Sequence, residues 1–402
     1  MKQRIFIFAL ALFFVGHSFI SAQDLSGVFD STVNYTAGAG DFPDHSWGIE
    51  EYANLRLRLR PKDNVILNAA FNLFALSGNY AIPAIGTGVM YGQNYAAGME
   101  LERLFFRING DLFDTEAGLL RMNFGYGQVW GSSDFLNPRN PLFPNARPRG
   151  VIGMNVSFYP ADTLKFTVFA AAPKNPLEAE GHGFIPGISL DQHFDRASIQ
   201  VLYAYETPKG SDEPHGSAEP PGSTEPPVSS SFGIHRFGLS LKADLELGFV
   251  ADALYTLNPD KRDGVKGLSA GAGFDYNFLS GDLYLLFEYL FNGSSSISAP
   301  VYGGTWKNNH YLYGTMLYRF NDFTSLALSA VLCFDDLSFS PFLTLNYEVF
   351  QGFSLNLVTR FAFDRKSFSR GEAGELGPCH PLPDGGEGGA RVIVNAGARL
   401  RF

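Results

Sequence analysis

Hydrophobic and polar side chains alternate one by one along many short stretches of this chain. The clearest stretch is residues 55–60, LRLRLR, in which Leu55, Leu57 and Leu59 share one parity and arginines occupy the other. A period of two is that of a β-strand, because successive side chains of a strand point to opposite faces. The pattern therefore predicts a strand with one apolar face and one polar face.

The same pattern returns at residues 391–402, RVIVNAGARLRF, where one parity is wholly apolar and the last residue is Phe402. Here the sequence resembles the closing strand of Gram-negative outer-membrane β-barrels. In that group a final aromatic residue is part of the signal that the outer-membrane assembly machinery reads. The resemblance implies that this machinery is a partner and that it recognises the chain through Phe402.

Residues 1–23 have the parts of a secretory signal peptide. Lys2 and Arg4 supply positive charge, residues 5–15 are an unbroken apolar run, and a small-residue cleavage site follows. A membrane-anchoring helix needs about 20 apolar residues, and this run is shorter. We therefore expect residues 24–402 to be exported. Any membrane span should then be a closed barrel, since helices and closed barrels satisfy their backbone in lipid.

The alternating segments are about ten residues long and are separated by turn residues. Residues 183–193 alternate poorly, because they contain Pro186 and two glycines. They are still predicted as a strand, since the polar segment 207–231 is too long for a periplasmic turn and must lie outside. The predicted strands are residues 27–36, 49–60, 64–76, 98–109, 112–123, 150–159, 163–171, 183–193, 197–205, 232–243, 246–257, 267–278, 281–292, 309–320, 323–334, 338–348, 352–363 and 391–402.

These segments predict an all-β fold, a transmembrane antiparallel up-and-down β-barrel of about 18 strands, with about 16 as the alternative. The lipid bilayer of the bacterial outer membrane is then its partner and its location. Both chain ends fall on the periplasmic side, where turns are short, and the longer loops are extracellular. Residues 207–231, rich in Pro, Gly, Ser and Glu, are expected to be a disordered extracellular loop.

Composition agrees with this class. The chain has 38 Phe, 18 Tyr and 44 Gly but a mean hydropathy near zero, which is the average that strands with one lipid-facing side produce. The net charge of −10 argues against a nucleic-acid partner. The two cysteines, Cys333 and Cys379, could form one disulfide, and two free thiols are the alternative.

Residues 124–149 form the segment best suited to narrow such a barrel. They contain Trp130 and other apolar side chains that could pack, prolines that prevent a regular helix, and the charged residues Asp134, Arg139 and Arg147. One interpretation is a loop folded against the inner wall that constricts the pore, and the other is an external loop that caps the rim. The stretch WGSSDFLNPRNPL resembles a Trp-Gly…Asp…Asn-Pro segment of porin-like outer-membrane proteins, which supports the channel class without identifying the solute.

Strand parity also predicts which charges line the pore. Arginine on the lipid face costs about 2–4 kcal/mol at the bilayer midplane, so the arginines opposite the leucines of residues 55–60 should point inward. The basic candidates are Arg56, Arg58, Arg60, Arg103, Arg107, Arg360 and Arg399, and the acidic candidates are Asp252, Asp275, Asp282 and Glu288. A basic arc facing an acidic arc would place a transverse field across the water column. In the alternative, opposite charges pair and only keep the lumen wet.

Together these features favour a porin-like channel for passive diffusion of small hydrophilic solutes, anionic ones included. The alternatives are a substrate-specific channel for hydrophobic or amphipathic solutes and a surface adhesin or structural barrel. The early start of the first strand leaves no room for a plug, which argues against an energy-coupled uptake receptor. No catalytic motif, metal-ligand spacing or cofactor fingerprint is present, so we expect no enzyme, metal or cofactor. The oligomeric state stays open.

Overall fold

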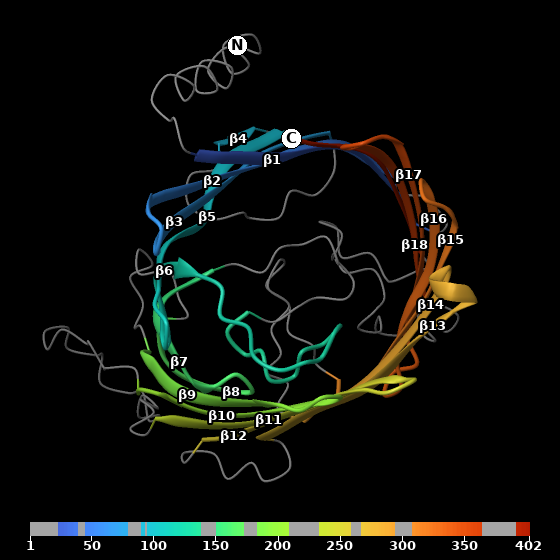
Figure 1. Ribbon diagram of the computed structural model, residues 1–402. Coiled ribbons are helices and arrows are strands. Elements are labelled where there is room, and N and C mark those ends of the chain that lie inside the picture. Colours follow the sequence, from blue (N-terminus) through green and yellow to red (C-terminus); the bar gives the residue numbers. More distant parts are fainter. Residues whose placement is uncertain are drawn as a thin grey trace, which may run out of the picture.

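A computed structural model of the chain describes residues 23–38, 45–78, 90–92, 95–137, 150–172, 183–208, 233–258, 267–293, 308–363 and 391–402. These residues form one closed, all-antiparallel barrel of 18 strands, as predicted (Figure 1). The described part holds no helix that is long and apolar enough to cross a membrane. The expected signal peptide up to residue 22, nearly all of the loop 207–231, Arg139, Arg147 and Cys379 lie outside the described residues.

The strands follow one another around the barrel in sequence order. They are β1 (Gln23–Gly38), β2 (His45–Lys62), β3 (Val65–Gly78), β4 (Met90–Gly92), β5 (Tyr95–Asn109), β6 (Phe113–Leu120), β7 (Val151–Ala161), β8 (Leu164–Ala172), β9 (Ile185–His193), β10 (Ala197–Glu206), β11 (Ile234–Asp244), β12 (Gly248–Leu257), β13 (Leu268–Phe278), β14 (Leu283–Asn292), β15 (His310–Asn321), β16 (Thr324–Cys333), β17 (Phe339–Phe350), β18 (Phe353–Ala362) and β19 (Arg391–Arg401). A 3-10 turn, η3 (Leu279–Gly281), joins β13 to β14. The short β4, which was not predicted, pairs with β5 and is not one of the 18 strands of the ring.

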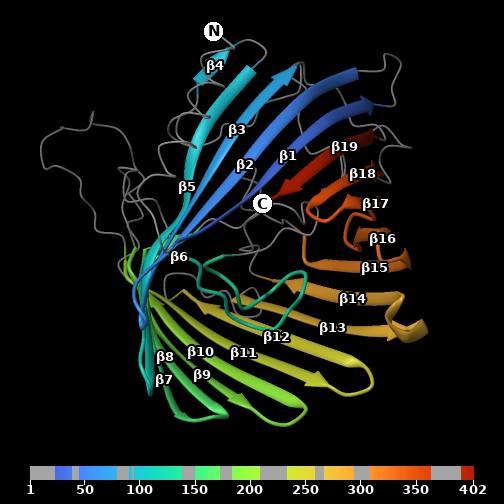
Figure 2. The same cartoon turned by 45° about the horizontal axis from the view of Figure 1, so that its top comes forward.

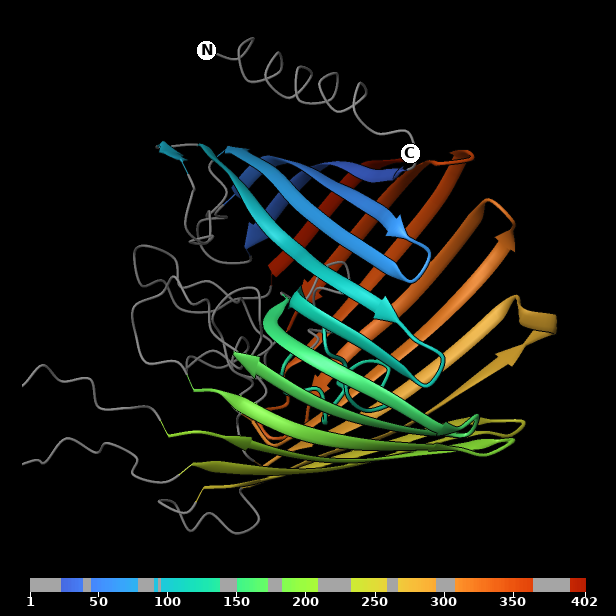
Figure 3. The ribbon, with the colours of Figure 1, turned by 60° about the vertical axis from the view of Figure 1, so that its left-hand side comes forward.

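The ring closes because β1 pairs with both β2 and β19. The poorly alternating segment is indeed a strand, since β9 pairs with β8 and β10. One predicted strand is too long: residues 112–123 were expected to be extended, but β6 ends at Leu120 and the chain then leaves the wall. Figure 3 shows the tight turns between consecutive strands gathered on the right-hand side, which is the periplasmic end.

The two parities of each strand meet different surroundings. On the outer face Val201 of β10 and Leu239 of β11 are 49% and 55% exposed. Their sequence neighbours Gln200 and Ser240 point inward and are buried. A continuous apolar outer belt is the surface that lipid covers, and the barrel is therefore one that crosses a membrane.

A β-bulge in β5 explains the irregular charge parity of that strand. The register with β3 shifts between Ala70 and Phe71 and leaves Glu102 unopposed. A bulge turns two successive side chains toward the same face, and Glu102 accepts a 2.7 Å hydrogen bond from Asn54. Glu102 and Arg103 therefore both serve the inner face, with 3.5 Å between their charged atoms.

The last residue of the chain closes the seam between β1 and β19. The N–H of Phe402 donates to the Gly27 carbonyl over 3.1 Å, and the N–H of Gly27 donates to the Phe402 carbonyl over 2.8 Å. The Phe402 ring lies directly over Gly27, because a Cβ built on Gly27 would come within 2.5 Å of that ring. The terminal aromatic side chain is thus part of barrel closure on the outer face.

Candidate functional site

After β6 the chain turns into the barrel, and residues 121–137 lie inside the ring of strands (Figures 1 and 2). We call residues 121–137 the inner loop. Two glycines permit its sharp turns: Gly125 has a φ of 82° and Gly131 a φ of 55°, in the left-handed region that other residues adopt rarely. The inner loop lies against the wall formed by β10 to β14, as its contacts with that wall demonstrate.

Asp252 on β12 holds the start of the inner loop by its backbone. Its Oδ1 accepts the N–H of Tyr126 over 3.0 Å, and its Oδ2 accepts the N–H of Gly127 over 2.6 Å. The approach requires glycine at position 127, since a Cβ there would come within 2.5 Å of the Asp252 Oδ2. Burial, and after it the Asp191 carboxylate, raises the pKa of Tyr126 to about 12, so this phenol stays neutral beside the acids.

Glu288 on β14 holds the next three residues. Its Oε2 accepts the N–H groups of Gln128 and Val129 over 2.9 and 3.0 Å, and its Oε1 accepts that of Trp130 over 2.8 Å. Glu288 is 2% exposed, and burying a carboxylate is costly unless hydrogen bonds compensate it. Five consecutive N–H groups, from Tyr126 to Trp130, therefore point at two anions, an arrangement of amides that favours negative charge.

Side chains add polar contacts between the inner loop and the wall. The Gln128 amide nitrogen donates to Asp275 over 2.8 Å, and its oxygen accepts from the Tyr284 hydroxyl over 3.0 Å. Further along the loop, the hydroxyls of Ser133 and Ser240 lie 3.0 Å apart. The inner loop is therefore fixed to the wall at several points along its length.

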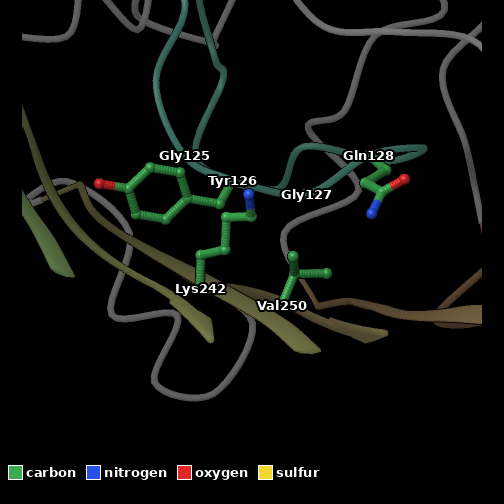
Figure 4. A pocket seen from close by; sticks show the side chains of 6 residues that line it. All are labelled: Gly125, Tyr126, Gly127, Gln128, Lys242 and Val250. Carbon is green, nitrogen blue, oxygen red and sulfur yellow. The ribbon is translucent and has the colours of Figure 1, made fainter. Parts of the chain in front are cut away.

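A pocket of about 470 Å³ lies between the inner loop and the wall (Figure 4). Its lining residues are Gly125, Tyr126, Gly127 and Gln128 of the loop and Lys242 and Val250 of β11 and β12. The Lys242 ammonium pairs with Asp244 at 2.9 Å.

Trp130 anchors the inner loop in an apolar part of the inner wall. Its side chain is fully buried, its indole N–H donates to the Glu288 carbonyl over 3.2 Å, and its ring centre lies 5.7 Å from that of Tyr311. The wall residues of this cluster are Leu286, Leu290, Tyr311, Tyr313, Val331, Cys333 and Phe342. An inner wall this apolar would be unfavourable in contact with water, and the inner loop shields it from the lumen.

A second apolar cluster holds both ends of the described loop. Its loop members Met122, Phe124 and Leu136 pack with Phe169, Ile185, Leu202 and other wall residues. The rings of Phe124 and Phe135 stack with 5.9 Å between centres. The Arg236 guanidinium lies 5.0 Å from the centre of the Phe135 ring, close enough for a cation–π interaction.

The wall that faces the inner loop across the barrel carries arginines among acids such as Glu102. In the ring of 18 strands, β12 is the ninth strand along from β2 and is therefore opposite to it. Arg56 and Arg58 lie on the inward parity of β2, and the Arg56 Nε donates to the neutral Asn54 side chain over 2.8 Å. Arg56 is exposed and Arg58 half-buried, so both present charge to the lumen.

Other predicted pore-lining arginines form ion pairs. Arg107 on β5 pairs with Glu116 on β6. Arg399 on β19 donates two hydrogen bonds to Asp30 on β1, over 2.6 and 3.2 Å. These pairs neutralise part of the basic arc, and Arg56 and Arg58 lie on the strand opposite Asp252.

The acids predicted to line the pore are placed differently from the arc that was expected. Asp252 and Glu288 are 4% and 2% exposed and serve the inner loop, which covers them, so an acidic arc open to the water column is not formed there. Asp275 is half-buried and bonded to the loop. Arg60 and Asp282 lie exposed at the periplasmic end. Arg60 is near the end of β2, and Asp282 directly precedes β14.

The two remaining predicted residues, Asp134 and Arg360, are buried and form hydrogen bonds within the protein. Asp134 is buried, and its Oδ1 accepts the N–H of Asn137 over 3.2 Å. Arg360 is buried and donates from Nε to the Ser340 hydroxyl over 2.8 Å. The sequence did not reveal the backbone amides that bind the wall acids. Their one trace is the Gly-Tyr-Gly run at residues 125–127, which permits the close approach.

Comparison with known proteins gives a likeness of fold. No family model and no curated protein matches the chain. Among solved structures, Pseudomonas aeruginosa OccK8 (OprE) is 8% identical with a TM-score of 0.54, over 96% of this chain and 99% of that one. P. aeruginosa OccK7 (OpdD) is 9% identical with a TM-score of 0.52, over 94% and 98%. Acinetobacter baumannii OccAB4 is 10% identical with a TM-score of 0.51, over 94% and 98%.

At such low identity the likeness concerns the fold alone. The closed barrel and its apolar belt define the class by structure, a transmembrane β-barrel with a porin-like fold. Within that class this chain is an 18-stranded barrel with an inner loop tied to one wall by Asp252 and Glu288.

Replacing Glu288 by Gln should loosen the inner loop. The amide keeps one acceptor oxygen where three N–H groups require two, and each hydrogen bond to a charged group contributes about 1.5–3 kcal/mol. We expect higher current noise and sub-conductance steps in planar-bilayer recordings. Asp275→Asn is the matched control, because Asp275 receives one loop hydrogen bond and Asn can still accept it. Noise equal to wild type in E288Q would show that other contacts suffice.

Proposed function

We propose that this barrel is a channel for passive diffusion of small hydrophilic solutes, with a weak preference for anions and no catalytic role. The observation that carries the proposal is the fixed inner loop, which narrows the lumen on one side and leaves the basic wall of β2 on the other. Barrels of 16 to 18 strands are wide enough for an aqueous channel. A loop held inside reduces such a channel without closing it.

A channel for hydrophobic solutes is supported less well. That reading needs aromatic side chains of the loop to face the lumen. Trp130 is instead fully buried in the wall cluster, and Phe135 stacks on Phe124 and Arg236. The apolar side chains of the inner loop therefore anchor it to the wall and do not form a hydrophobic path for a solute.

Proteoliposome swelling tests the proposal. Vesicles that contain the refolded protein should swell in iso-osmotic solutions of a small neutral sugar and of a small carboxylate salt, with rates that fall smoothly as the solute grows. Vesicles with heat-denatured protein are the control. Uptake of one amphipathic solute alone, with saturation, would favour the substrate-specific alternative. No swelling with any solute would favour an adhesin or structural barrel.

Charge around the constriction supports the anion preference. Asp252 and Glu288 lie under the inner loop and are 4% and 2% exposed, whereas Arg56 and Arg58 lie on the inward parity of β2. Selectivity depends on the charges at the narrow part of a pore and not on the net charge of the chain. Glu50 and Glu100 lie further toward the outer end of β2 and β5, so the preference is expected to be weak.

Replacing Arg56 and Arg58 by Gln should move the reversal potential in a salt gradient toward cation preference. The expected shift corresponds to a change in permeability ratio of about twofold to fivefold, because two partly solvated charges act at an effective dielectric near that of water. Arg60→Gln is the control, since Arg60 lies exposed at the periplasmic end of β2. A wild-type pore that already favours cations, or a double variant without a shift, would contradict the assignment.

We further propose that the assembly machinery recognises the chain through Phe402, on the resemblance of the closing strand. Deleting Phe402 should leave the protein in the periplasm, where it is degraded, while Phe402→Tyr should assemble normally. Refolding in detergent separates recognition from stability: a deletion variant that refolds but does not reach the outer membrane lacks the recognition element. Normal outer-membrane amounts of the deletion variant would refute this role.

A further inference from the structure

Three tyrosines on the outer face each share a hydrogen bond with a histidine of the neighbouring strand. We call them the tyrosine–histidine pairs. The distances from hydroxyl oxygen to Nδ1 are 2.7 Å in Tyr35–His45, 2.9 Å in Tyr203–His235 and 2.5 Å in Tyr289–His310. Their ring centres are 5.8, 6.1 and 6.2 Å apart in the same order.

The three pairs have the same register. Each histidine lies opposite the residue two positions after its tyrosine, so His45 opposes Ala37, His235 opposes Tyr205 and His310 opposes Phe291. The same diagonal contact therefore recurs between β1 and β2, between β10 and β11, and between β14 and β15. Because the same tyrosine–histidine geometry occurs at three separate places on the ring, we expect an environment that the three places share.

Those surroundings are the extracellular rim of the lipid-facing surface. His45, His235 and His310 each stand at the first or second residue of a strand that starts at the end away from the tight turns. Tyr35 and Tyr289 are 41% and 37% exposed on the outer face. In a membrane barrel this is the level at which hydrocarbon gives way to headgroups, where amphipathic aromatic rings gather.

The pairs tolerate a change of charge. A tyrosine hydroxyl can donate to a neutral imidazole or accept from an imidazolium, so the hydrogen bond survives when the ring gains a proton. Histidine as a residue type gains its charge between about pH 8 and pH 5. Tyr35 contacts the His45 ring, Tyr203 and Tyr205 contact the His235 ring, and Tyr289 contacts the His310 ring. The Asp335 carboxylate lies at the His310 backbone N–H.

Asp335 sets one pair apart from the other two. Its carboxylate accepts the backbone N–H of His310 over 2.7 Å, so a negative charge already lies next to this pair. An external anion would meet competition at His310 and none from a carboxylate among the groups named at His235. The pair formed by Tyr203 and His235 is therefore the better placed of the two to bind an anion.

We propose that the tyrosine–histidine pairs bind the phosphate groups of anionic lipids in the outer leaflet, and that they bind them more tightly as the pH falls. Each pair presents a ring donor at headgroup level, and a protonated ring adds a charge-assisted hydrogen bond to a phosphate oxygen. The rim would then hold the barrel at a fixed depth by contacts around the ring. This role is separate from conduction through the lumen.

Spin-labelled lipids test the proposal. The refolded protein is placed in phosphatidylcholine bilayers, and electron paramagnetic resonance measures the association of spin-labelled phosphatidylglycerol relative to spin-labelled phosphatidylcholine at pH 5.5 and pH 8. Phosphatidylglycerol keeps a single charge across this range, so any change belongs to the protein. Wild type should prefer phosphatidylglycerol at about pH 5.5 by roughly fivefold per protonated site and clearly less at about pH 8.

The variant with His45, His235 and His310 all changed to Gln should lose the pH-dependent part of this preference. His235→Gln alone should lower it more than His310→Gln, because of Asp335. His193→Gln is the matched control, since His193 faces the lumen at the periplasmic end and bonds Ser198. A preference that is equal at both pH values in wild type, unchanged in the triple variant, or lowered equally by His193→Gln would overturn the proposal.

Discussion

The architecture of the lumen depends on two wall carboxylates that accept hydrogen bonds from five consecutive backbone N–H groups. Asp252 and Glu288 hold the inner loop against the wall. The loop in turn makes their burial tolerable, because its N–H groups supply the hydrogen bonds that buried carboxylates require. Trp130 then covers an apolar inner wall that water would otherwise meet. Remove the carboxylates, and neither the loop backbone nor the apolar wall has a good alternative partner.

Because of these contacts, two acidic residues that strand parity assigns to the pore lining are buried under the inner loop instead. By strand parity alone Asp252 and Glu288 belong to the lining of a water column, yet both are nearly inaccessible. The inner loop covers both carboxylates, while Arg56 and Arg58 lie on the inward parity of the opposite strand, β2. The net charge of −10 does not by itself decide the selectivity of such a lumen, because selectivity depends on the charges that line the narrow part.

The barrel was predictable from sequence because a lipid-facing strand must alternate, and LRLRLR or the closing RVIVNAGARLRF leaves little choice of register. Even the weak strand β9 followed from the requirement that turns alternate in length. The inner loop was not predictable to the same depth. Its backbone amides carry no residue-specific mark, and the bulge at Glu102 shifts parity without altering composition. Pairing of loop and wall acids is a long-range contact, which periodicity does not encode.

The central claim is that the inner loop stays against the wall while the channel conducts. The hydroxyls of Ser133 and Ser240 lie 3.0 Å apart, so cysteines at both positions, in a chain with Cys333 and Cys379 changed to Ser, should form a disulfide under mild oxidation. Single-channel conductance in a planar bilayer should then be the same in the oxidised and reduced states, because the bond fixes the loop where it already is. Failure to cross-link, or a conductance that changes severalfold on reduction, would contradict the account.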